Sequence, residues 1–191
     1  MASVLAALRD GKPARTVEVS GEEQPIFRAL QLITAKPVLY ACNVEEESAA
    51  TGNAHSDRVA EMAAAQGQGC VVVSAAIEAE VALLDTEAEK AEFLEALSLE
   101  QTGLAGVVRA GYELLELITF FTSGPKETRA WTVKRGAKAP QAAGAIHTDF
   151  EKGFIKACNG EQGAKEAGKM RQEGKDYVVQ DGDILLFRFN V

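Results

Sequence analysis

The sequence predicts two domains in tandem, an α/β unit followed by an α+β unit with a small mixed sheet. In the first unit, two short apolar runs alternate with helical patterns, which is typical of a doubly wound parallel sheet. In the second unit, an alternating run at 117–122, a turn at 123–125 and a returning strand at 128–133 predict a hairpin. A helical segment and further strands follow, and together these elements outline a β-grasp (ubiquitin-like) fold.

The composition is that of an ordinary globular protein, with 47% hydrophobic and 25% charged residues in a chain of 191. No apolar run approaches the roughly 20 residues that span a bilayer. The first residues lack the charged-then-apolar pattern of a signal peptide. We therefore expect a cytoplasmic protein without a membrane partner.

The net charge of −8 is unevenly distributed along the chain. Residues 1–125 hold 8 basic and 19 acidic side chains, a difference of −11, whereas residues 126–191 hold 12 basic and 9 acidic ones, a difference of +3. This asymmetry indicates two units with different partners.

The metal-ligating residue types are few and scattered. Cys42, Cys70 and Cys158 include no CxxC pair, and the only histidines are His55 and His147. This pattern argues against a disulfide framework and a structural zinc site. We expect no metal site and ordinary thiols in a reducing compartment.

The first elements are predicted from helical spacing and stop signals. A short amphipathic helix precedes the break at 11–13, and Ser20 with Glu23 fits a capping box before a helix that ends at Pro37. The apolar run 38–42 then predicts a buried parallel strand covered by helices on both faces.

The remaining elements of the first unit continue the alternation. We predict a helix over 54–66, a second buried strand over 70–73, and a helix that follows 74–76. Thr86 and Glu89 form a capping box for a helix that reaches about residue 97. A helix over 103–116 then connects the first unit, residues 1–102, to the second, residues 117–191.

Two polar loops lie where ligands bind in such sheets, outside the carboxyl ends of the strands. These loops are residues 43–46 and 74–76. A lone asparagine after a strand is also a common turn former, so its position alone leaves both interpretations open.

The second half of the chain resembles a known family. ITFFTSGPKETRAWTVKRGAKAPQAAGAIHTDFEKGFI and the C-terminal EGKDYVVQDGDILLFRFNV are similar to the TGS domain of the YchF/Obg-like ATPases. Upstream, LQLITAKPVLYACNVEEESAATGNA resembles the nucleotide-base motif region of the same family. The resemblance implies the last part of a P-loop NTPase domain followed by a TGS domain. Around Cys158 and Asn159 the family usually carries a longer segment, including part of a strand.

The resemblance also implies how a nucleotide base is recognised. P-loop GTPases use Asn-Lys-x-Asp, in which the aspartate accepts two hydrogen bonds from guanine, whereas this chain has Asn-x-x-Glu and its family prefers ATP. Ala76 departs from the family pattern, where lysine is common. The residues expected at the base are Asn43, Val44, Glu46, Ser74 and Ala75.

The chain contains no G-x-x-x-x-G-K-[ST] motif, whose amides, lysine and hydroxyl hold the phosphates and Mg²⁺. ATP and Mg²⁺ are implied for the longer parent enzyme, and we expect neither to bind tightly to this chain alone. We also expect the chain to be inactive in hydrolysis by itself.

A group of cations on the predicted hairpin and the loop after it is the second candidate site. TGS domains recur in ribosome- and tRNA-linked proteins, so the resemblance implies a surface that faces RNA. The alternative is a solvated strand face, with Trp131 packed in the core rather than stacked on a base. The cations are Lys126, Arg129, Lys134, Arg135 and Lys138.

Two hypotheses for function follow. In the first, the chain is the base-recognising and ribosome- or RNA-binding portion of a YchF-type ATPase. In the second, it is a protein–protein adaptor that uses the β-grasp surface. His147 with Asp149 is interpreted as structural or as part of a binding surface, because no nucleophile in the sequence requires a catalytic base.

Overall fold

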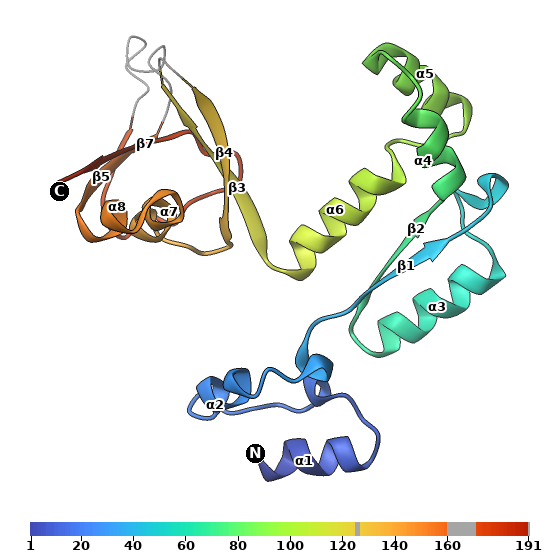
Figure 1. The fold of residues 1–191 in the computed structure, drawn as a ribbon, viewed down its shortest axis with the longest axis horizontal. Coiled ribbons are helices and arrows are strands. Elements are labelled where there is room, and N and C mark those ends of the chain that lie inside the picture. The colour runs from blue at the N-terminus through green and yellow to red at the C-terminus, as the bar shows by residue number, and fades with distance from the viewer. Residues whose placement is uncertain (125–126, 160–170, 191) are drawn as a thin grey trace. The chain divides into compact units, whose positions relative to one another are not determined.

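The computed structural model describes residues 1–124, 127–159 and 171–190, and the chain forms two compact units. Unit 1 comprises Met1–Leu114 and unit 2 comprises Leu115–Val191. Figure 1 shows the helices and strands of both units. No helix in the described ranges is both long and apolar enough to cross a membrane.

Unit 1 combines a two-stranded parallel sheet with helices, as Figure 1 shows. Three short 3-10 helices, η1, η2 and η3, lie between the larger elements. Its helices and strands are α1 (Ala2–Arg9), η1 (Ala14–Thr16), α2 (Gln24–Ala29), η2 (Ile33–Ala35), β1 (Leu39–Asn43), η3 (Glu46–Ser48), α3 (Ala54–Ala65), β2 (Gly69–Val73), α4 (Ala75–Val81), α5 (Glu87–Ala96) and α6 (Gly103–Leu114). The helix predicted to connect the units, α6, therefore lies in unit 1.

The parallel pairing of β1 with β2 confirms the predicted α/β pattern. Leu39 pairs with Gly69 and Asn43 with Val73, so both strands end at the same edge. Helices α3 and α6 both contact the two strands. The prediction that the strands are fully buried is wrong: every residue of β2 is half-buried, and Ala41 in β1 is exposed. Two helices on a two-stranded sheet leave the outer strand edges uncovered.

The predicted capping box at Ser20 and Glu23 does not form. Glu23 is the N-cap of α2 with helical backbone angles, and no side chain caps that helix. The Glu23 carboxylate instead accepts a hydrogen bond from the amino group of Met1 at 2.6 Å. Helix α2 ends at Ala29, and Gln31 has φ = +47°, so the prediction of one helix up to Pro37 is also wrong. A left-handed residue cannot continue a right-handed helix.

Two other helices of unit 1 are capped by side chains, one of them as predicted. Thr86 and Glu89 form the predicted capping box, with the Glu89 amide donating to the Thr86 hydroxyl at 3.2 Å. Helix α3 begins as expected, and its N-cap Asn53 accepts from the amides of His55 and Ser56. Both caps satisfy amides that a helix N-terminus leaves unpaired.

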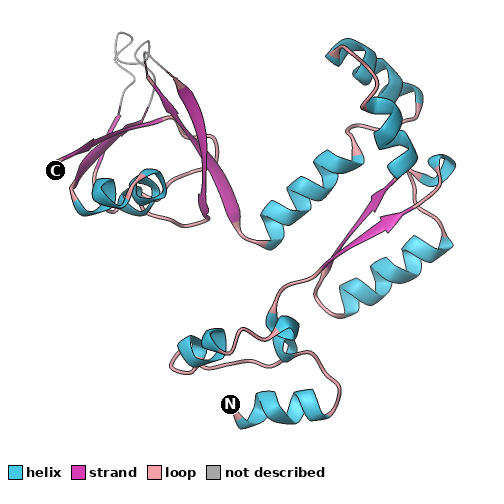
Figure 2. Ribbon diagram, viewed as in Figure 1, coloured by secondary structure: helices cyan, strands magenta, loops and turns pink. Residues whose placement is uncertain are grey.

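The described residues of unit 2 form two sheets that meet at one parallel bridge, and Figure 2 shows these strands and helices. Strand β3 (Leu117–Ser123) pairs antiparallel with β4 (Thr128–Lys134), which confirms the hairpin. Strand β5 (Phe154–Asn159) lies between β6 (Arg171–Glu173) and β7 (Leu185–Phe189), antiparallel to both. The bridge joins Phe121 to Ile184, and the Phe121 amide donates to the Asp183 carbonyl at 2.7 Å. The strands therefore follow the order β4, β3, β7, β5, β6.

Two helices lie between β4 and β5, where the sequence predicts a loop followed by one short helical segment. The expected segment is α8 (Thr148–Lys152), and its N-cap His147 accepts from the Asp149 amide through Nδ1 at 3.2 Å. Helix α7 (Ala139–Ile146) was not predicted. Its Ala139, Ala142 and Ala143 are fully buried. Small side chains let this helix approach the sheet closely, so an alanine-rich stretch that looks like a loop forms part of the core.

Among the described residues of unit 2, buried apolar side chains from strands and helices form the core cluster. Phe120 is fully buried, and its ring meets that of Phe187 edge to face, with 5.9 Å between centroids and 88° between planes. The cluster comprises Ile118, Phe120, Val133, Ala137, Ala139, Ala142, Ala143, Phe154, Ala157, Val179 and Leu185.

The expected shortening near Cys158 and Asn159 falls at the end of β5. The backbone of both residues is paired on both sides, with Gln172 and Arg171 of β6 and with Leu186 and Leu185 of β7. The strand is therefore continuous up to Asn159, and the segment after it lies outside the described residues.

Candidate nucleotide-base and RNA-binding sites

The two polar loops predicted at the base site are joined at the carboxyl edge of the sheet. The Asn43 side chain accepts through Oδ1 from the Ala75 amide at 2.9 Å. The Val44 amide donates to the Val73 carbonyl at 2.9 Å. These bonds fix the loop after β1 against the start of α4 and leave the Asn43 amide nitrogen as a donor. The structure therefore brings Asn43, Val44, Ser74 and Ala75 together.

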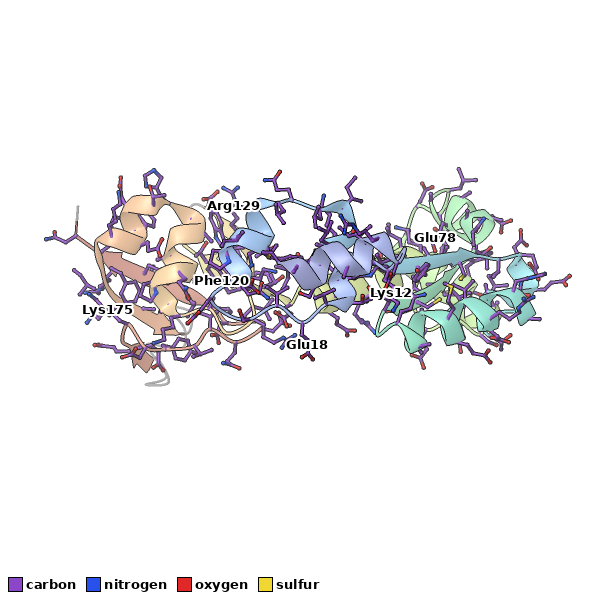
Figure 3. The ribbon with its side chains drawn as sticks, turned by 90° about the horizontal axis from the view of Figure 1, so that it is seen from below. Lys12, Glu18, Glu78, Phe120, Arg129 and Lys175 are labelled. Atoms are coloured by element: carbon purple, nitrogen blue, oxygen red, sulfur yellow. The ribbon has the colours of Figure 1, made fainter. Side chains whose placement is uncertain are left out.

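Ser74 has an unusual environment for a polar side chain. It is 3% exposed, and its hydroxyl has no hydrogen-bond partner among the described residues. It lines a cavity of about 370 Å³ at the carboxyl end of β2, together with Ile77, Glu78 and residues 98–103. Glu78, labelled in Figure 3, accepts from the Gly103 amide at 2.6 Å. A buried hydroxyl without a partner is costly, because it loses the hydrogen bonds that water supplies in the unfolded chain.

The acidic residues after Asn43 have different roles. Glu46, the residue predicted at the base, begins η3 and is exposed, and its carboxylate has no hydrogen bond or ion pair among the described residues. Glu45 accepts from the Ser48 hydroxyl at 2.6 Å and from the Asn53 amide group at 3.2 Å. The Ser48 hydroxyl, followed by backbone and Asn53 hydrogen bonds, lowers the pKa of Glu45 below its ordinary value. The sequence gives no sign of this link between the loop and the cap of α3.

At the far end of the predicted basic group, Arg129 lies over an aromatic ring. Its guanidinium carbon is 4.4 Å from the centroid of the Trp131 ring, and Figure 3 labels Arg129 in unit 2. Trp131 is half-buried, packs against the core cluster and donates from Nε1 to the Thr122 hydroxyl at 2.9 Å. The ring thus contributes to the core on one side and carries a cation on the other. Lys126 lies outside the described residues.

The other three cations lie around the end of β4 and the start of α7. Lys134 donates to the Leu115 carbonyl at 2.6 Å, and Lys138 pairs with Asp176 at 2.8 Å. The hydrogen bond and charge of Lys138 lower the pKa of Asp176. The exposed Arg135 side chain has no partner among the described residues.

Lys134 and Arg135 line a groove of about 330 Å³ with Gly136, Ala137 and Gln141. Arg129 is five residues from Lys134 along β4, or roughly 17 Å. Lys134 and Arg135 therefore form a local pair, with the ion-paired Lys138 nearby in the chain. Arg129 lies apart from them, at the other end of β4.

Within the described ranges, no three histidine, cysteine, aspartate or glutamate side chains form a group that could hold a metal ion.

Comparison with known proteins shows close relatives. The family model YchF-GTPase_C, described as "Protein of unknown function (DUF933)", matches residues 117–190. "Ribosome-binding ATPase YchF" from Escherichia coli O157:H7 is 52% identical over 197 residues, which cover 98% of this chain and 54% of the relative. "Obg-like ATPase 1" from Rattus norvegicus is 42% identical over 193 residues, which cover 94% and 48%. The chain thus spans about half the length of the curated relatives it matches.

Solved structures agree with the sequence relatives. The YchF GTPase of Schizosaccharomyces pombe superposes with a TM-score of 0.81 and 32% identity, over 97% of this chain and 53% of that one. A GTP-binding protein from Pyrococcus horikoshii shares the fold, with a TM-score of 0.61 and 22% identity. The chain belongs to the YchF/Obg-like ATPase family.

Proposed function

We propose that this chain is the C-terminal portion of a YchF-type ATPase, with a base-recognition loop in unit 1 and a ribosome-binding TGS domain in unit 2. The observation that carries the proposal is similarity along almost the whole chain to relatives named ribosome-binding ATPases. Because the sequence lacks a P-loop, the chain has no ATPase activity alone, and ATP and Mg²⁺ belong to the longer enzyme. A ribosomal partner implies a cytoplasmic location.

The strand order of unit 2 supports a β-grasp fold of the TGS type. A hairpin lies beside a C-terminal strand through a parallel bridge, and the strand after the helices pairs antiparallel with that C-terminal strand. Helices α7 and α8 supply buried alanines and Phe150 to the core. A mixed sheet with helical cover on its core side is the arrangement that the sequence predicts for this domain.

The base-recognition part of the proposal rests on the Asn43–Ala75 hydrogen bond and the Ser74 hydroxyl. Adenine presents both a donor and acceptors at its edges, which suits an amide nitrogen and a hydroxyl. Glu46, one methylene longer than the aspartate of guanine-specific loops, weakens selection of guanine. The expected result is weak binding that favours ATP over GTP.

Nuclear magnetic resonance titration of the isotope-labelled chain tests this expectation. Millimolar ATP should shift the amide signals of Val44 and Ala75 more than equal GTP does, and Asn43→Ala should reduce the shifts. Equal shifts with both nucleotides, or shifts confined to other residues, would contradict base recognition by this loop.

The ribosome-binding part of the proposal rests on the exposed cations of unit 2. Phosphate contacts made by lysine and arginine release counterions, so such binding weakens steeply with salt. Lys134 and Arg135 both line the groove between the end of β4 and the start of α7. Binding through these cations is therefore expected to fall steeply as salt rises.

Reversing both charges, Lys134→Glu with Arg135→Glu, is expected to weaken ribosome binding at least about tenfold and to lower the salt slope by about 2. Co-sedimentation of the chain with ribosomes across a salt series measures both quantities. The matched control is Lys152→Glu with Lys175→Glu, which makes the same charge change at exposed positions of the same unit. An equal effect of both pairs would show that binding depends on the overall charge of the unit, and not on a contact surface around Lys134 and Arg135.

The same experiment distinguishes the adaptor hypothesis from binding to RNA. An interaction with a protein through the β-grasp surface is expected to be nearly insensitive to salt and to these reversals. Binding to ribosomal proteins without a salt slope would therefore favour an adaptor and overturn RNA contact.

A further inference from the structure

Two cysteines of unit 1 face each other across neighbouring strands. The register pairs Tyr40 with Cys70 and Cys42 with Val72, so Cys42 and Cys70 share one face of the sheet. Their sulfur atoms are 3.7 Å apart. Both thiols are free, and both residues are half-buried.

The backbone does not favour a direct disulfide between these thiols. Cys42 lies two residues beyond the partner of Cys70, which corresponds to a Cα separation of about 8 Å from the usual strand rise and spacing. Disulfides require Cα atoms closer than about 7 Å. An ion bound between the two sulfur atoms does not require the Cα atoms to lie within about 7 Å, because the sulfurs need not bond to each other.

The distance between the two sulfur atoms matches the distance between two sulfur ligands of one tetrahedral metal ion. Two metal–sulfur bonds of about 2.3 Å at a tetrahedral angle place the sulfurs about 3.8 Å apart. We propose that Cys42 and Cys70 form a two-thiolate site for one thiophilic divalent cation of the zinc class. Since no group of three ligating side chains exists among the described residues, solvent completes the coordination.

The site lies on the α3 side of the sheet. A Cβ on Gly103 of α6 would touch Val73, so α6 covers the face of Val73, and alternation puts Cys70 on the opposite face. Helix α3, the other helix that contacts both strands, covers that face. A bound cation links β1 to β2 directly before Asn43, and it therefore stabilises the strand ends that carry the base loop.

Titration of the full chain with Cd²⁺, under a phosphine reductant, tests the site. The thiolate-to-cadmium absorption band and native mass spectrometry are expected to show one ion per chain. Cys42→Ser and Cys70→Ser should each lower the affinity at least about tenfold, since loss of a direct ligand should cost no less than loss of an outer-shell partner. Cys158→Ser, which removes the remaining thiol, should leave the affinity unchanged. Unchanged binding in Cys42→Ser or Cys70→Ser would overturn the site.

A measurement on the unmodified chain covers the case in which a serine variant does not fold. Bound Cd²⁺ is expected to slow alkylation of both Cys42 and Cys70 by iodoacetamide, read residue by residue after proteolysis. Alkylation of Cys158 should keep its rate. Protection of only one thiol of the pair, or of none, would rule out the two-thiolate site.

Discussion

Phe120→Ala is expected to lower the free energy of unfolding of unit 2 by about 3–5 kcal/mol, the cost of removing a buried phenylalanine from a packed core. Phe120 is fully buried, and its ring contacts Phe187 edge to face. Trp131, the single tryptophan of the chain, lies in unit 2. Denaturant titration followed by tryptophan fluorescence therefore reports on unit 2 alone.

The matched control is Phe121→Ala, one residue further along β3. Phe121 is half-buried and points to the other face of the strand, so its truncation should cost clearly less. An equal loss from both variants would show that the core is not centred on Phe120.

Gly153→Ala is expected to destabilise unit 2 by about 1–3 kcal/mol or more, because the added methyl group meets backbone. A Cβ at Gly153 would collide with the Asn190 carbonyl oxygen. The same two residues are joined by a hydrogen bond from the Asn190 amide to the Gly153 carbonyl at 2.8 Å. A backbone atom cannot rotate away, so the end of β7 must move from the start of β5. The fluorescence-detected unfolding midpoint measures the effect.

Gly174→Ala serves as the control for Gly153→Ala. No atom lies within 4 Å of a Cβ built at Gly174, and its φ is not in the left-handed region. Its unfolding midpoint should stay within experimental scatter of the parent. A similar loss from both variants would mean that the contact with Asn190 does not set the cost, because replacing glycine by alanine lowers the entropy of the unfolded chain and by itself stabilises the fold.

Local patterns predicted those elements whose signals are carried by neighbouring residues. The capping box at Thr86 and Glu89 formed because both partners lie within one turn. The box at Ser20 and Glu23 did not form: Glu23 itself takes the N-cap position of α2, and its carboxylate accepts from the Met1 amino group, 22 residues away. Sequence spacing contains no information on such a distant competitor.

The same limit applies to the candidate site and to α7. The loops that contain Asn43 and Ala75 could be assigned to one edge because parallel strands end together. The hydrogen bond between them, 32 residues apart, and the unpartnered hydroxyl of Ser74 depend on packing. Helix α7 was hidden because proline and glycine are typical of loops. Pro140 lies in the first turn, where proline is tolerated, the four alanines favour a helix, and the helix packs against β4 and β5.

The position of β7 between β3 and β5 has a consequence for how unit 2 acquires its structure. The bridge from Phe121 to Ile184 and the hydrogen bond from Thr119 to Asp181, 62 residues apart, give the domain a high contact order. Such non-local pairing slows folding. During synthesis, the β3–β4 hairpin and β5 emerge first, and each keeps an open edge until residues 185–189 arrive. The nascent chain of unit 2 thus exposes unpaired strand edges, which favour aggregation, until β7 is made.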